Sequence, residues 1–137
     1  MCIRDSRSAA RAAAMKLLYE WEMGGNGGED TRLGLLEIQP GEEEADYMEA
    51  TVSGVQQHVQ EIDSQIEKYA IGWPISRINR VDLSILRLGI YEIAYGTGVP
   101  GGVAVNEAVE LAKTFSGPES GSFVNGVLGS FLRAQDQ

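Results

Sequence analysis

The stretch VAVNEAVELAKTF, residues Val103–Phe115, is followed closely by FVNGVLG, residues Phe123–Gly129. In both stretches apolar side chains recur every three or four residues, which is the period of an amphipathic α-helix. Residues Ser116–Pro118 interrupt this period, because glycine and proline break helices. We therefore predict two helices that lie back to back, and an all-α fold for the chain.

The same period continues from this pair toward the N-terminus. It predicts helices over about residues 7–23, 31–37, 42–59, 62–69, 77–95, 103–115 and 119–132, with Ser76 as the N-cap of the fifth and breaks at residues 24–28 and 60–63. The helix that ends near Tyr95 carries the widest apolar belt, so we expect it to be central and most buried. Strands need an alternation of period two, which we do not find. The expected architecture is a compact bundle of about seven helices.

The length of 137 residues predicts one domain, with no need of a disulfide or metal for stability. We place this domain at residues 7–137 and interpret Met1–Ser6 as a cloning or sequence-assembly scar outside the helical pattern. Cys2 is the only cysteine, so no internal disulfide forms, as is typical of the reducing cytoplasm. No apolar run approaches the roughly 18 residues of a membrane span. We expect a cytoplasmic protein without a membrane partner.

The net charge of −9 is unevenly distributed. Residues 29–49 hold eight acidic residues and one basic residue, whereas residues 1–28 hold four basic and three acidic ones. An acidic chain disfavours nonspecific binding to a phosphate backbone, which needs clustered lysine and arginine. A local contact with RNA or with a basic protein partner stays open, and the first helix is the only region with a positive balance.

No constellation of residues predicts catalysis, a cofactor or a metal. The segment Gly96–Gly101 reads GTGVPG, but a helix precedes it and Pro100 lacks the N–H that a dinucleotide cradle needs. We interpret it as a turn between helices. His58 is the only histidine, and zinc-protease, paired-cysteine and nucleophile-elbow motifs are absent. The chain is expected to be a binding module and not an enzyme.

A few side chains qualify as binding groups on their chemistry. Arg7 and Arg11 lie one helical turn apart and form a thin candidate patch for phosphate. Phe123 and Asn125 offer a ring and a polar edge to an unpaired base, although packing in the core suits Phe123 equally well. Tyr19 lies off the apolar stripe and is available to a partner. Glycines at 126 and 129 predict the close approach of a neighbouring helix or a ligand.

Three arginines follow one face of the central helix, at positions 77, 80 and 87. They could contact RNA, but a guanidinium fork suits fixed pairs with carboxylates. We favour structural pairs with Asp82, Glu92 or Glu67.

Several segments in order resemble one family. They are RSAAR (7–11), LYEWE (18–22), GV (54–55), ID (62–63), ILRLGIYEI (85–93), VPGGVAVNEAVELAK (99–113) and FVNGVL (123–128). This pattern resembles the NusB transcription antitermination factors from about Arg7 to Leu132. The resemblance implies two small helical bundles packed together. It also implies binding to boxA RNA of ribosomal RNA operons with NusE, a small-subunit ribosomal protein, in an RNA polymerase complex that suppresses premature termination.

The resemblance also implies roles for single residues. Arg7 and Arg11 map to the RNA-contacting first helix, and Phe123 and Asn125 to a segment near the RNA. Tyr19 and Glu92 map to the side that faces NusE. Because the first helix has few arginines, we expect RNA binding to be weak alone and strengthened by NusE. Two alternatives remain: the NusB-like domain of an RNA cytosine methyltransferase, or a helical protein-interaction module without RNA binding.

Overall fold

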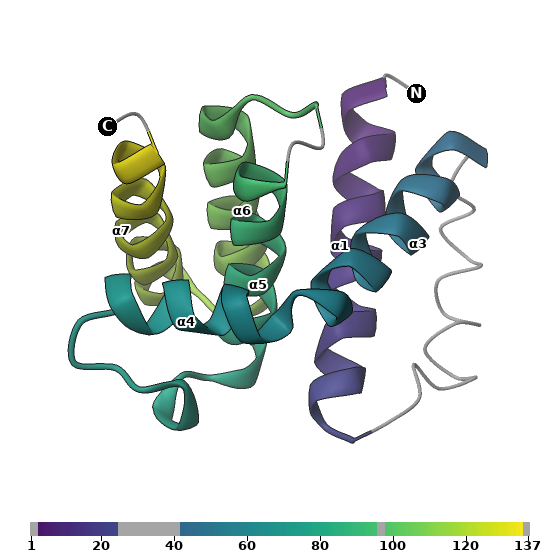
Figure 1. The fold of residues 1–137 in the computed structure, drawn as a ribbon. Helices are drawn as coiled ribbons and strands as arrows, with labels where there is room; N and C mark the ends of the chain where they lie inside the picture. The colour runs from purple at the N-terminus through teal and green to yellow at the C-terminus, as the bar shows by residue number, and fades with distance from the viewer. Residues whose placement is uncertain (1–2, 25–41, 96–97, 136–137) are drawn as a thin grey trace.

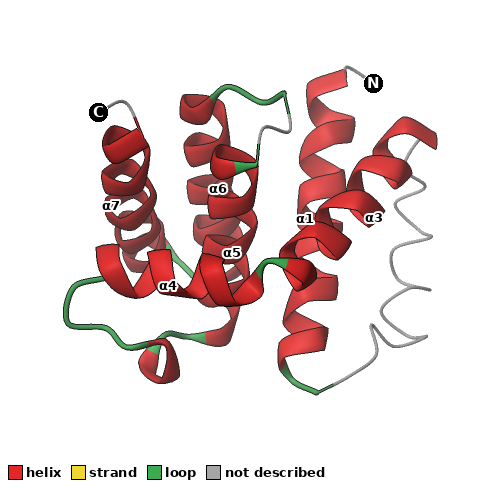
Figure 2. Ribbon diagram, viewed as in Figure 1, coloured by secondary structure: helices red, strands yellow, loops and turns green. Residues whose placement is uncertain are grey.

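The structure is a computed structural model that describes residues 3–24, 42–95 and 98–135. Its elements are α1 (Ile3–Glu22), α3 (Glu42–Gln57), α4 (Val59–Tyr69), the 3-10 helix η1 (Ile75–Arg77), α5 (Arg80–Ala94), α6 (Gly101–Phe115) and α7 (Pro118–Gln135). The described residues form helices and loops without any strand (Figure 2). The all-α fold predicted from the period is therefore confirmed.

The helices form two groups that share α5 (Figure 1). Helices α1 and α3 pack against each other on one side, and α4, α6 and α7 gather on the other. Helix α5 lies between them and contacts all five. The expected pair of packed helical bundles is confirmed.

Helix α5 owes its central place to apolar side chains on nearly all of its faces, with a few polar side chains buried among them. Every residue from Asp82 to Ile90 is buried. Each large aliphatic side chain fully buried in this way contributes roughly 1.5–3 kcal/mol relative to exposure. At Gly89 the helix also comes very close to α7, because a Cβ there would lie 2.6 Å from Cδ1 of Leu128. The predicted central helix is thus confirmed, and a glycine allows its contact with α7.

Several helix ends differ from those predicted. Helix α1 begins at Ile3, so the expectation that the first six residues stand outside the helical pattern is wrong for Ile3–Ser6. No glycine or proline separates these residues from Arg7, so the helix continues through them. The break between α3 and α4 falls at His58 instead of residues 60–63. The helix predicted over residues 31–37, and most of the glycine loop before it, lie outside the described residues.

The start of α5 is set by Asn79 and not by Ser76. The Asn79 side-chain oxygen accepts hydrogen bonds from the backbone N–H of Val81 at 2.8 Å and of Asp82 at 3.4 Å. Asparagine is a strong N-cap because its oxygen satisfies amides that the first helical turn leaves unpaired. Ser76 instead lies within η1. None of the helices in the described ranges is both long and apolar enough to span a membrane.

Candidate nucleic-acid interface

Arg11 of α1 and Glu92 of α5 form a buried ion pair. The Nε atom of Arg11 lies 3.0 Å and 3.2 Å from the two carboxylate oxygens of Glu92. Their side chains are only 5% and 2% exposed. Burial alone would lower the pKa of Arg11, but the charge and hydrogen bond of Glu92 outweigh it, and the pKa is raised. The structure therefore places these two candidate contact residues against each other in the interior.

Arg7 lies one turn earlier on α1 and is half-buried. Its guanidinium carbon lies 4.1 Å from the centre of the Tyr47 ring on α3, within the range of a cation–π contact. The hydroxyl of Ser8 donates a hydrogen bond to Glu107 of α6 at 3.0 Å. The start of α1 is thus tied to both α3 and α6, and Arg7 is the more accessible of the two predicted arginines.

A cavity of about 580 Å³ opens beside these arginines. It is lined by Arg7, Arg11, Gly98, Val99, Pro100, Val103, Asn106 and Glu107. Pro100 is the N-cap of α6 and supplies no side-chain cap to the first amides of the helix. The partial positive charge of a helix start favours anions, and Arg7 adds a full charge next to it. This corner of the molecule can accept a phosphate group.

Phe123 and Asn125 lie on the first half of α7. The Phe123 ring is half-buried and meets the Trp73 ring edge-on, with centroids 5.9 Å apart. Asn125 is exposed. A Cβ at Gly126 would meet no described atom within 4 Å, so the predicted close approach of a neighbouring helix is wrong at this position. At Gly129 a Cβ would come near only a side-chain nitrogen of Arg133, from the same helix. The exposed surface around Gly126 leaves space for a ligand.

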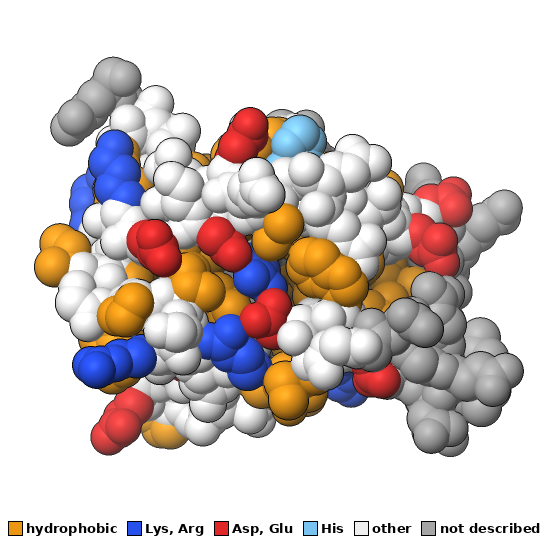
Figure 3. Space-filling model, turned by 60° about the horizontal axis from the view of Figure 1, so that its bottom comes forward, with side chains coloured by type: hydrophobic (Ala, Val, Ile, Leu, Met, Phe, Trp, Pro, Cys, Tyr) orange, Lys and Arg blue, Asp and Glu red, His pale blue; other side chains and the backbone are white. Residues whose placement is uncertain are grey.

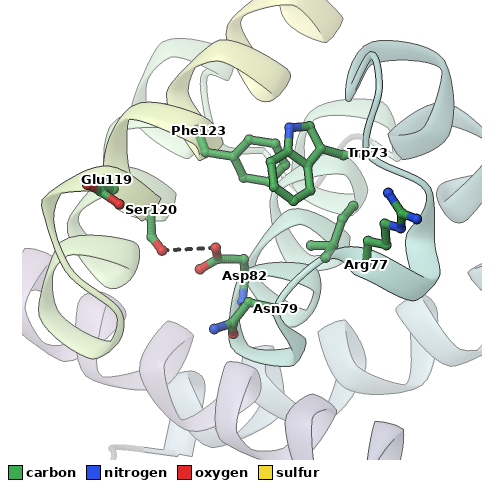
Figure 4. A pocket seen from close by; sticks show the side chains of 8 residues that line it. Trp73, Arg77, Asn79, Asp82, Glu119, Ser120 and Phe123 are labelled. Atoms are coloured by element: carbon green, nitrogen blue, oxygen red, sulfur yellow. Dashed lines mark hydrogen bonds between the residues drawn. The ribbon is translucent and has the colours of Figure 1, made fainter.

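Sequence reasoning missed a second cavity beside Phe123, of about 300 Å³ (Figure 4). It is lined by Trp73, Arg77, Ile78, Asn79, Asp82, Glu119, Ser120 and Phe123. We predicted that Asp82 pairs with an arginine, but the structure shows another partner. The Oδ2 atom of Asp82 accepts a hydrogen bond from Ser120 Oγ at 2.9 Å. The lining comes from the α4–α5 connection, α5 and α7, so no local motif could have indicated it.

The two predicted RNA-contacting regions lie at opposite ends of α6. Side chains bridge α1 and α6 along their length, from the Ser8–Glu107 hydrogen bond to Lys16, whose Nζ lies 5.2 Å from the centre of the Phe115 ring. Helix α7 then runs back antiparallel to α6 (Figure 1). Fifteen residues of α6 span about 22 Å. One RNA strand that contacts both Arg7 and Phe123 would have to span about the length of this helix.

The arginines of α5 are paired with carboxylates, as favoured, but their partners differ from those predicted. Arg87 binds Asp63 through two hydrogen bonds of 2.8 Å and Glu22 through one of 2.7 Å. Arg80 binds the other oxygen of Glu22 at 2.8 Å. Although burial acts to raise the pKa of Glu22, the hydrogen bonds from both arginines outweigh it, and the pKa is lowered. Arg77 is exposed at the cavity beside Phe123.

The remaining candidates lie apart from these clusters. Tyr19 is half-buried on α1. His58 stacks on Tyr95 with ring centroids 4.3 Å apart, and the described residues contain no group of histidine, cysteine and acidic side chains that could hold a metal. Helix α5 ends at Ala94 and α6 begins at Gly101, so the described residues Gly98–Pro100 of the GTGVPG segment belong to the connection between these helices. On the face turned forward in Figure 3, basic and acidic side chains are interspersed, so it shows no single-sign patch.

These features define a small all-helical protein of two packed bundles with separate basic and aromatic surface groups. Residues 8–133 match the sequence profile of the NusB family. A protein of Acetivibrio thermocellus named transcription antitermination protein NusB is 46% identical over 130 residues, covering 94% of this chain and 90% of its own. A protein of the same name from Thermoanaerobacter sp. (strain X514) is 39% identical over 136 residues, covering 93% and 91%. The chain belongs to the NusB family.

Solved structures agree with this assignment. A structure of antitermination factors NusB and NusE in complex with dsRNA is similar with a TM-score of 0.83 and 32% identity, covering 97% of this chain and 99% of that one. A structure of T. maritima NusB is similar with a TM-score of 0.81 and 28% identity, covering 93% and 90%.

Proposed function

We propose that the chain is a transcription antitermination factor that binds boxA RNA of ribosomal RNA operons together with the ribosomal protein NusE. The pair would act in the cytoplasm within an RNA polymerase complex and suppress premature termination. The observation that carries this proposal is the similarity over 97% of the chain to NusB from a complex with NusE and double-stranded RNA. The role is one of binding and not of catalysis.

In this proposal Arg7 contacts the RNA backbone directly. It borders the cavity at the start of α6. Its contact with Tyr47 already restricts its long side chain, so less conformational entropy is lost when it binds RNA. Arg11 is too buried to present its full guanidinium, so its part is to hold α1 against α5 and thereby position Arg7. Phe123 and Asn125 contact the RNA at the far end of α6.

NusE would bind at the side of α1 that carries Tyr19. Glu92 is 2% exposed, so it supports this interface through its pair with Arg11 and not by direct contact. Because the chain has a net charge of −9, a basic partner is attracted to it and can supply the phosphate contacts that the arginine-poor α1 lacks. This charge favours weak RNA binding alone and stronger binding with NusE.

The alternative of a methyltransferase domain receives less support. The transcription antitermination proteins named above match over 90% and 91% of their own lengths, so the similarity is to whole antitermination proteins and not to one domain of a larger protein. A helical module that binds only protein is the other alternative. The acidic charge favours it, but the arginine-lined cavity at the start of α6 does not.

The test is fluorescence anisotropy of a labelled boxA RNA titrated with the protein, with and without NusE, at two salt concentrations. We expect binding that NusE strengthens, that weakens with salt, and that a scrambled RNA of equal length does not share. NusE binding without any RNA binding would identify a protein-interaction module. The absence of binding to both would overturn the proposed function.

A further inference from the structure

The cavity beside Phe123 contains a buried acceptor without a partner. Asp82 is 6% exposed, and its Oδ2 atom is occupied by the Ser120 hydroxyl at 2.9 Å. Its Oδ1 atom is also buried but has no hydrogen-bond partner among the described residues. Burying such an oxygen costs free energy unless a donor reaches it. Since Asp82 lines the cavity, a ligand there can supply that donor (Figure 4).

Donors lie next to this acceptor. The Asn79 side-chain oxygen is engaged in capping α5, which leaves the Nδ2 group of the same amide to donate. Arg77 adds an exposed cation to the lining. The cavity therefore offers a buried hydrogen-bond acceptor, an amide donor and a positive charge, and the exposed carboxylate of Glu119 also lines it.

Two aromatic rings form the opposite wall. Trp73 and Phe123 meet at an interplanar angle of 62°, so each can offer a face to a flat ligand but the two cannot enclose it as parallel plates. The volume of about 300 Å³ lies at the lower end of the range for small-molecule sites. A cavity of this volume can accommodate one planar ring system.

We propose that this cavity binds an unpaired guanine base of the RNA, an inference that rests on the proposed function. Proteins read unpaired bases by stacking on aromatic rings and by hydrogen bonds to the base edge. Guanine alone among the four bases presents neighbouring imino and amino donors beside a carbonyl acceptor. The donors suit Asp82, the carbonyl suits the Asn79 amide, and the adjoining phosphate suits Arg77.

A guanidinium group from a protein partner is the main competitor for the site. It would also satisfy Asp82 and stack on the rings. The carboxylates of Asp82 and Glu119 would attract its charge and Arg77 would repel it, but it carries no acceptor for the Asn79 amide. The mixed set of donors and acceptors therefore favours the base.

The experiment is an NMR titration of the ¹⁵N-labelled protein with 5′-GMP, followed at the indole signal of Trp73. Trp21 provides an internal reference, because its ring contacts Arg87 on another part of the molecule. We expect GMP to shift the Trp73 signal and to bind about tenfold more tightly than IMP, which lacks the amino donor, or than AMP and UMP.

Two variants and a control sharpen the result. Asp82→Asn retains the shape of the side chain but removes its charge and one of its two acceptor oxygens, so GMP binding should weaken about tenfold. Trp73→Ala, at an exposed position of the α4–α5 connection, removes the indole signal, so its titration is followed at the backbone amides of Ser120 and Phe123. It should weaken GMP and IMP by the same factor. Glu61→Gln removes an exposed carboxylate from a different cavity and should change neither.

Equal binding of all nucleotides, or no shift of Trp73 with GMP, would overturn the inference. Binding of N-acetylarginine amide in preference to GMP would assign the cavity to a protein partner and overturn it as well. The titration contains neither boxA RNA nor NusE. A failure of GMP while those two still bind refutes only the guanine site, whereas GMP binding without boxA binding refutes the proposed function.

Discussion

Arg11 and Glu92 are 81 positions apart in the sequence, yet the arginine Nε lies within 3.2 Å of both oxygens of the glutamate. The pair joins α1 to α5, the helix that the two helical groups share. Glu107 of α6 comes within 4.0 Å of the same guanidinium. A single buried arginine thus links three helices.

Removal of one partner of this pair should destabilise the fold severely. Arg11→Met leaves the carboxylate of Glu92 buried without its cation, which costs about 3–5 kcal/mol of unfolding free energy. Urea denaturation followed by circular dichroism measures the loss. The double variant with Glu92→Leu should recover most of it, because an apolar pair of similar volume needs no compensation. A loss below about 1 kcal/mol in Arg11→Met would contradict the structural role assigned to the pair.

Arg7→Ala should separate RNA binding from stability. The contact with Tyr47 is worth only about 0.5–1 kcal/mol at a partly exposed site, so the fold should persist. In the presence of NusE, RNA affinity should fall, and the slope of log affinity against log salt should decrease by about one unit. Arg133→Ala, which removes an exposed arginine near the end of α7, is the matched control. Equal effects of both changes would refute the direct contact proposed for Arg7.

The ion pairs of Glu22 should make the free energy of unfolding depend on pH. Its pKa is lowered in the folded chain, because the hydrogen bonds from Arg87 and Arg80 outweigh burial. A lowered pKa stabilises the fold at pH values above the unfolded pKa of about 4.3, and this contribution disappears as the pH falls through the folded value. The difference in unfolding free energy between the wild type and Glu22→Gln should thus be large at pH 7 and small near pH 2. A difference that stays constant with pH would argue against the ion pairs.

Two helical glycines should respond in opposite ways to alanine. At Gly89 the new methyl group would lie 2.6 Å from a fully buried Leu128 side chain, so overpacking should cost about 1–3 kcal/mol. At Gly126 it would meet nothing, so the higher helix propensity of alanine should add up to about 1 kcal/mol. Thermal unfolding of both variants checks this. A stabilised Gly89→Ala would show that α5 and α7 are less closely packed than described.

Gly126→Ala carries a second readout. If RNA lies against the exposed surface around Gly126, next to the contacts proposed for Phe123 and Asn125, the added methyl group should weaken boxA binding even though it stabilises the fold. Unchanged RNA affinity would place the RNA elsewhere on α7.

The helix pattern was accessible from the sequence because it depends on neighbours a few residues apart. The apolar belt of residues 81–94 indicated the central helix, and the breaks at glycine and proline separated most elements correctly. Errors occurred where a competing local signal decided the boundary. Asn79 caps α5 better than Ser76 because its side chain reaches two amides, and α1 starts early because nothing interrupts it.

The partners of the polar side chains depended on tertiary packing. Arg87 has carboxylates available at many positions, and only the packing of α1 and α4 on α5 selects Glu22 and Asp63. The same is true of Asp82, whose hydroxyl partner Ser120 lies 38 positions later on α7. The spacing of apolar residues along the sequence indicates which face of a helix is buried. It does not indicate which other helix packs against that face. Side chains whose chemistry depends on a distant partner therefore become interpretable only when the helices are assembled.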